Sequence, residues 1–124
     1  MMVKRSLVSV VDDDQSVRES LPDLLGEFGL AARTFLSAEE FLASDFIGET
    51  KCLILDIALP GMTGPQLQRE LKLRHQNIPI IFITADRNEI VRSDLLKRGA
   101  VECLFKPFSD AALLEAINAA LLAS

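Results

Sequence analysis

The stretch SVVDDDQSVRESL (residues 9–21) places Asp12, Asp13 and Asp14 directly behind a short apolar run. Aspartate is depleted in strand interiors, and neighbouring carboxylates repel one another. A strand that is apolar up to Val11 therefore ends there, and the aspartates begin the loop that follows it. Two interpretations of this loop stay open at this point: the aspartates cap the next helix, or they form an acidic site at the mouth of the strand.

Apolar runs rich in β-branched residues alternate along the chain with longer segments of helical periodicity. The predicted strands are residues 7–11, 31–35, 52–55, 78–84 and 101–105. Ser37, Thr63 and Ser109 are typical residues for the start of a helix, whereas Pro22 is expected to kink the first helix or cost about 3 kcal/mol. Strand and helix alternate five times, which predicts a doubly wound α/β domain whose parallel strands are joined by crossover helices.

The composition indicates one globular domain rather than a disordered chain or a membrane protein. The 124 residues are 49% hydrophobic and 25% charged, with a formal net charge of −5. An acidic chain is a poor general nucleic-acid binder, and no apolar run approaches the ~20 residues of a membrane helix. Cys52 and Cys103 match no metal-binding spacing and are expected to be core residues. We expect one cytoplasmic domain over residues 1–124, with no second domain and no contact with a membrane or nucleic acid.

Polar side chains follow four of the five predicted strands. In sheets of this kind, ligands bind outside the carboxyl ends of the strands. The side chains expected at that edge are those of Asp12, Asp13, Asp56, Thr84 and Lys106. Crowded carboxylates favour a bound cation, and Mg²⁺ prefers such hard oxygen ligands. One carboxylate could then attack phosphorus, with the hydroxyl and the ammonium group binding phosphoryl oxygens.

Four segments of the chain together resemble the receiver domains of bacterial two-component response regulators: VVDDD (10–14), LILDIALPGMTG (53–64), IIFITA (80–85) and GAVECLFKPF (99–108). The resemblance covers nearly the whole chain and implies a CheY-like, flavodoxin-like fold with the strand order 2-1-3-4-5. It also implies a signalling switch that is not an enzyme beyond its own phosphotransfer and dephosphorylation. The phosphoryl group would come from a sensor histidine kinase or a phosphotransfer protein.

The resemblance assigns the phosphotransfer roles to individual residues. Asp56 is expected to be the phosphoacceptor. Thr84 and Lys106 are expected to bind oxygens of the phosphoryl group, and the peptide bond from Lys106 to Pro107 is expected to be cis.

The resemblance also implies a bound Mg²⁺, for which Mn²⁺ can substitute. Its expected ligands are Asp13 and Asp56, Asp12 largely through water, and the main-chain carbonyl of Ala58. Ala58 and Asp86 would border the route of a hydrolytic water, so the lifetime of the phosphorylated state stays open.

One position departs from the family pattern and concerns the switch. Cys103 stands three residues before Lys106, where the family has an aromatic residue that follows the threonine inward. A thiol cannot reproduce the swing of a large ring. We therefore expect the switch to rely on Thr84 and its loop, or on coupling through Phe105 or Phe108.

Three other functions are less consistent with the sequence than a receiver domain. A magnesium phosphohydrolase needs a second carboxylate two residues after its nucleophile, where Ala58 stands. A flavodoxin-like FMN carrier is disfavoured because DDDQS (12–16) would repel the phosphate. A pseudo-receiver that only binds proteins is disfavoured because all five site residues are present.

The ending of the chain leaves its larger context open. The chain is either a single-domain regulator or the receiver of a longer protein. GAVECLFKPF resembles receivers that precede helix-turn-helix DNA-binding domains, so an output domain beyond Ser124 is one expectation. A homodimer formed on phosphorylation is another.

Overall fold

Five parallel strands form one sheet in the order β2-β1-β3-β4-β5. The computed structural model describes residues 5–123, so the expected domain limits at residues 1 and 124 lie outside the described residues. The strands are β1 (Leu7–Val11), β2 (Ala31–Phe35), β3 (Thr50–Asp56), β4 (Ile80–Thr84) and β5 (Glu102–Phe105). The doubly wound fold and the strand order expected from the sequence and the resemblance are therefore confirmed.

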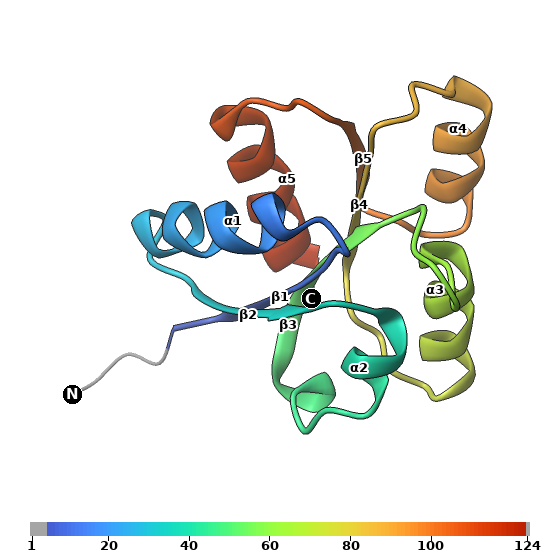
Figure 1. Cartoon of the computed structure of the whole chain (residues 1–124), viewed down its shortest axis with the longest axis horizontal. Coiled ribbons are helices and arrows are strands. Elements are labelled where there is room, and N and C mark those ends of the chain that lie inside the picture. Colours follow the sequence, from blue (N-terminus) through green and yellow to red (C-terminus); the bar gives the residue numbers. More distant parts are fainter. Residues whose placement is uncertain (1–4, 124) are drawn as a thin grey trace.

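Helices cover both faces of the sheet and make a three-layer domain (Figure 1). One face is covered by α1 (Gln15–Glu27) and α5 (Asp110–Ala123), and the other by α2 (Ala38–Leu42), α3 (Gly64–Leu73) and α4 (Glu89–Lys97). A single 3₁₀ turn, η1 (Ile47–Glu49), leads into β3. None of the helices in residues 5–123 has the length and apolar character that a bilayer span requires.

The hydrophobic core consists of two clusters of buried residues, one on each face of the sheet, and the central strands contribute to both. In β3, Leu53 and Leu55 pack in the cluster beneath α2, α3 and α4, whereas Cys52 and Ile54 pack in the cluster beneath α1 and α5. A strand covered on both faces must be apolar at successive positions, which explains the uninterrupted run that marks β3 in the sequence. Cys52 and Cys103 are both buried and free, which confirms that they are core residues.

A side-chain cap begins each of the five α-helices in residues 5–123. The capping residues each accept a hydrogen bond from a main-chain N–H in the first turn of the helix that follows, and they are Asp14, Ser37, Thr63, Asn88 and Ser109. The capping interpretation of the acidic run is therefore correct for Asp14, which precedes α1. Helix α1 continues through Pro22 as a single element, so Pro22 does not end it.

Two glycines provide a direct test of this packing. An added Cβ at Gly64 would lie 2.5 Å from the Asp56 main-chain oxygen and 3.1 Å from the Phe82 ring, whereas a Cβ at Gly26 meets nothing within 4 Å. Gly64→Ala is expected to lower the free energy of unfolding by about 1–3 kcal/mol because of overpacking.

The matched control is Gly26→Ala within α1, which is expected to raise the free energy of unfolding by roughly 0.5–1 kcal/mol, since alanine favours the helix. Urea unfolding followed by circular dichroism measures both variants. Equal effects of the two substitutions would contradict this description of the β3–α3 junction.

Candidate functional site

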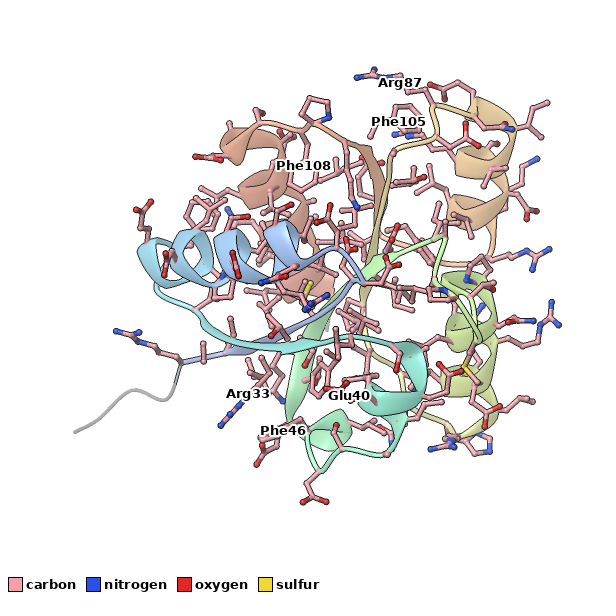
Figure 2. All side chains as sticks on the ribbon, viewed as in Figure 1. Arg33, Glu40, Phe46, Arg87, Phe105 and Phe108 are labelled. Carbon is pink, nitrogen blue, oxygen red and sulfur yellow. The ribbon has the colours of Figure 1, made fainter. Side chains whose placement is uncertain are left out.

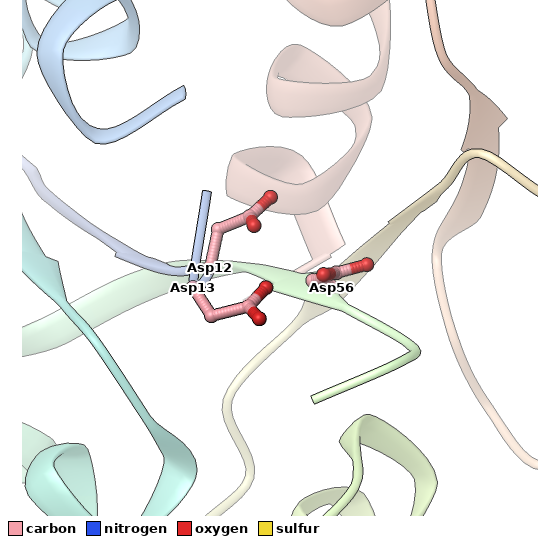
Figure 3. Close-up of side chains that lie close together, drawn as sticks. All are labelled: Asp12, Asp13 and Asp56. Atoms are coloured by element: carbon pink, nitrogen blue, oxygen red, sulfur yellow. The ribbon is translucent and has the colours of Figure 1, made fainter. Parts of the chain in front are cut away.

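Three carboxylates meet at the carboxyl edge of the sheet. Strands β1 and β3 are neighbours with Val11 aligned to Leu55, so the residues after β1 and at the end of β3 lie side by side. One carboxylate oxygen from each of Asp12, Asp13 and Asp56 lies within 4.8 Å of the others (Figure 3). Asp12 is fully buried and Asp56 is 7% exposed, whereas Asp13 is exposed to solvent.

Hydrogen bonds hold Asp12 at both carboxylate oxygens and at its main-chain carbonyl. Its Oδ2 accepts a hydrogen bond from Lys106 Nζ at 2.9 Å, and its Oδ1 accepts one from the main-chain N–H of Asp14 at 2.9 Å. Its main-chain carbonyl accepts a hydrogen bond from Arg18 at 2.9 Å. The sequence does not indicate this contact, because Arg18 lies among the polar residues of α1. Asp12 is thus oriented by its neighbours, while Asp13 remains the carboxylate open to a ligand from solvent.

Lys106 is the cation of the site. Its Nζ lies 4.0 Å from Asp56 Oδ1 as well as 2.9 Å from Asp12. Burial lowers the pKa of Lys106, but the hydrogen bond to Asp12 and the charge of Asp56 outweigh it, so the net shift is upward. The main-chain N–H of Lys106 donates to the Thr84 carbonyl at 2.7 Å, and the Lys106–Pro107 peptide bond is cis.

One lysine does not neutralise three carboxylates, and both burial and the remaining negative charge raise the pKa of Asp56. Burial, followed by the charge of Asp12, raises the pKa of Asp56 from its ordinary value of 3.8 to about 6. Lys106 and the main-chain N–H of Ala58 act in the opposite direction, and Asp13 adds a further upward contribution. A cluster of hard oxygen donors with excess negative charge fits a divalent cation such as Mg²⁺.

Thr84 ends β4, next to β3, and its side chain is only 4% exposed. Its hydroxyl accepts a hydrogen bond from the main-chain N–H of Asp86 at 3.1 Å, which orders the start of the loop before α4. Asp86 itself is exposed. Further along this loop, the Arg87 guanidinium lies 5.8 Å from the centre of the Phe105 ring (Figure 2). The loop after Thr84 is therefore in contact with β5.

Cys103 lies in the core of β5, where it is joined to α4 through its backbone. Arg92 donates from Nε to the Cys103 carbonyl at 3.1 Å and from Nη2 to Glu102 at 2.6 Å. Burial raises the pKa of the Cys103 thiol, which suits a core side chain. The sequence pattern did not indicate Arg92, because nothing in the helical periodicity of α4 shows which strand its side chain reaches.

The loop between β3 and α3 completes the site. It carries Ala58, which is exposed, and it is anchored by Leu59, which is 4% exposed. The carboxylate of Glu39 in α2 accepts a hydrogen bond from the main-chain N–H of Met62 at 3.0 Å. The sequence pattern does not indicate this contact, because it joins residues far apart in the chain.

The family model described as the response regulator receiver domain matches residues 8–118 of the chain. The chain therefore belongs to the receiver domain family of two-component response regulators, and its acidic cluster of Asp12, Asp13 and Asp56 lies at the site expected for that family. This confirms the resemblance drawn from the sequence.

Curated relatives of the chain include transcriptional regulators. The transcriptional regulatory protein TdiR of Thauera aromatica is 42% identical over 116 residues, which cover 94% of this chain and 51% of TdiR. Nodulation protein W of Bradyrhizobium diazoefficiens is 44% identical over 116 residues, with the same shares of the two chains. The chain thus spans about half the length of these relatives.

Solved structures share the fold. The response regulator StyR is 42% identical with a TM-score of 0.88, over 97% of this chain and 61% of StyR. The structure described as FixJ-N is 36% identical with a TM-score of 0.85, over 97% of this chain and 96% of its own.

The raised pKa of Asp56 predicts that its negative charge destabilises the fold. The folded state binds the Asp56 proton more tightly than the unfolded state does. The free energy of unfolding of wild type therefore falls as the pH rises from about 4 to about 6, and above that range the destabilisation by the Asp56 charge is fully present. Asp56→Asn is expected to raise the free energy of unfolding at neutral pH by roughly 1–3 kcal/mol and to remove this pH dependence.

Urea unfolding at several pH values measures the effect, with Asp45→Asn as the control because Asp45 is an exposed carboxylate of equal charge. A lower free energy of unfolding in Asp56→Asn, or an equal increase in Asp45→Asn, would contradict the conclusion that the charge of Asp56 destabilises the fold.

Proposed function

We propose that the chain is a phosphorylation-activated switch in which Asp56 accepts a phosphoryl group from a sensor histidine kinase or a phosphotransfer protein. The observation that supports this most strongly is the meeting of three carboxylates beside a single lysine. Lys106 reaches both Asp12 and Asp56, so the cluster combines a nucleophile, a cation site and a fixed positive charge.

In the transfer, an oxygen of the Asp56 carboxylate forms the new bond to phosphorus. The bond from phosphorus to the donor's imidazole nitrogen breaks, and its electron pair leaves with the imidazole. Lys106 Nζ, at 4.0 Å from Asp56 Oδ1, would bind one oxygen of the transferred group. The Thr84 hydroxyl and the Ala58 N–H would bind the others, because these groups flank Asp56 and a phosphoryl group needs its equatorial oxygens stabilised.

The residues present also fit the expected Mg²⁺. Asp13, Asp56 and the Ala58 carbonyl would hold the ion directly, with Asp12 acting through water because both of its carboxylate oxygens already accept hydrogen bonds. When bound, Mg²⁺ would neutralise negative charge on the carboxylates and on the phosphoryl oxygens. Mn²⁺ takes similar oxygen ligands and would substitute.

The switch would act through Thr84. Phosphorylation adds roughly two negative charges and strong acceptor oxygens beside this residue. If its hydroxyl turns toward them, the N–H of Asp86 loses its present partner, and the loop that leads to α4 changes. Cys103 has no ring to follow this movement, so we propose that the loop itself, which touches Phe105 through Arg87, carries the signal.

The output is proposed from the relatives. TdiR is named a transcriptional regulatory protein, and this chain matches about half of it. We propose a cytoplasmic receiver that controls an output domain, of DNA-binding helix-turn-helix type, beyond Ser124. A homodimer formed on phosphorylation is part of the same proposal.

Incubation with acetyl phosphate and Mg²⁺ tests the phosphoacceptor. Wild type is expected to gain one phosphoryl group, seen as an increase in intact mass, and Asp56→Asn is expected to gain none. Lys106→Met should be labelled about tenfold or more slowly, since it removes a charge that stabilises the transferred group. EDTA should prevent labelling of all variants. A phosphoryl group on another residue, or undiminished labelling of Asp56→Asn, would refute the proposed function.

A further inference from the structure

Two adjacent glutamates of α2 have different environments. The Oε2 atom of Glu39 accepts a hydrogen bond from the main-chain N–H of Met62 at 3.0 Å, across 23 residues of sequence. Both glutamates are exposed, but the hydrogen bond of Glu40, labelled in Figure 2, is local: its main-chain N–H donates to the Ser37 hydroxyl that caps the helix. Glu39 therefore links α2 to the loop between β3 and α3, while the Glu40 hydrogen bond stays within the helix and its cap.

The Glu39 carboxylate also lies directly against the turn that it binds. Gly61 has a φ of +73°, a conformation that favours glycine, and an added Cβ there would lie 2.5 Å from Glu39 Oε2. The hydrogen bond from Met62 lowers the pKa of Glu39, which keeps the carboxylate ionised and accepting. The turn at Gly61 and the Glu39 side chain thus fit each other closely.

The same loop forms part of the acceptor site. The main-chain N–H of Ala58 bonds to the Asp56 carboxylate, two residues after the end of the strand. The loop is fixed at its start by the buried side chain of Leu59, and at its end by the hydrogen bond from the Gly64 N–H to the Ile57 carbonyl at 3.0 Å. Between these two points, Glu39 holds the exposed turn from outside.

We propose that Glu39 is a positioning residue for the acceptor site: by binding the Met62 N–H, it holds the β3–α3 loop so that the N–H and carbonyl groups of Ala58 stay against Asp56. The inference rests on the proposed function of that site. Glu39 makes no contact with the reacting atoms, and the hydrogen bond rather than its charge is what the loop requires.

Three variants separate these contributions. Glu39→Ala removes the acceptor, Glu39→Gln keeps an acceptor oxygen without the charge, and Glu40→Ala is the matched control on the same helix. Two readouts are used: hydrogen exchange of the Met62 amide by NMR, and Mn²⁺ affinity from the electron paramagnetic resonance signal of the free ion.

Glu39→Ala is expected to speed exchange of the Met62 amide and to weaken Mn²⁺ binding by about three- to tenfold, the equivalent of one hydrogen bond. Glu39→Gln and Glu40→Ala should stay near wild type in both measurements. Wild-type Mn²⁺ affinity in Glu39→Ala would overturn the inference while leaving the proposed function standing. An equal loss in Glu39→Gln would overturn it as well, because charge would then be the cause. A wild type that binds no Mn²⁺ would overturn the proposed function and the inference together.

Discussion

Electrostatic repulsion among Asp12, Asp13 and Asp56 is the constraint around which the carboxyl edge of the sheet is arranged. Parallel strands end on the same side, and β1 and β3 are neighbours, so this topology forces their terminal carboxylates together. Lys106 pairs with Asp12 and lies near Asp56, but one ammonium group leaves excess negative charge. Burial and, after it, the charge of Asp12 raise the pKa of Asp56. The ionised site therefore destabilises the fold, and the proposed binding of a cation and a phosphoryl group gives this cost a functional reason.

Much of this arrangement could be predicted from the sequence because it depends on backbone topology. Apolar runs at successive positions mark buried parallel strands, and polar residues that follow such runs must lie at one edge of the sheet. This pattern predicts that Asp12, Asp56 and Thr84 lie near one another. The order of the strands came from the family resemblance, since the alternation of strand and helix does not determine which strands are neighbours.

The sequence could not show how long side chains reach between elements. Arg18, Glu39 and Arg92 each bind a main-chain group outside their own helix, and helical periodicity marks them only as polar positions. The sequence pattern also predicts the start of β3 wrongly, for a similar reason. β3 begins at Thr50, before the predicted apolar run, because the buried Thr50 hydroxyl is hydrogen-bonded to that of Ser9 at 2.7 Å. These contacts depend on tertiary structure, and one of them, from Arg18 to the Asp12 carbonyl, is made to the acidic cluster itself.

The central claim, that the carboxylates share a divalent ion, can be measured without any phosphodonor. A ligand that binds only the folded state raises its unfolding temperature. Thermal unfolding should therefore be recorded with and without millimolar Mg²⁺, at ionic strength matched with a monovalent salt, for wild type and for Asp13→Asn. Because Asp13 is exposed, its substitution should leave the fold intact. The account predicts that Mg²⁺ raises the unfolding midpoint of wild type and has little effect on Asp13→Asn. An equal rise in both proteins, or none in wild type, would contradict it.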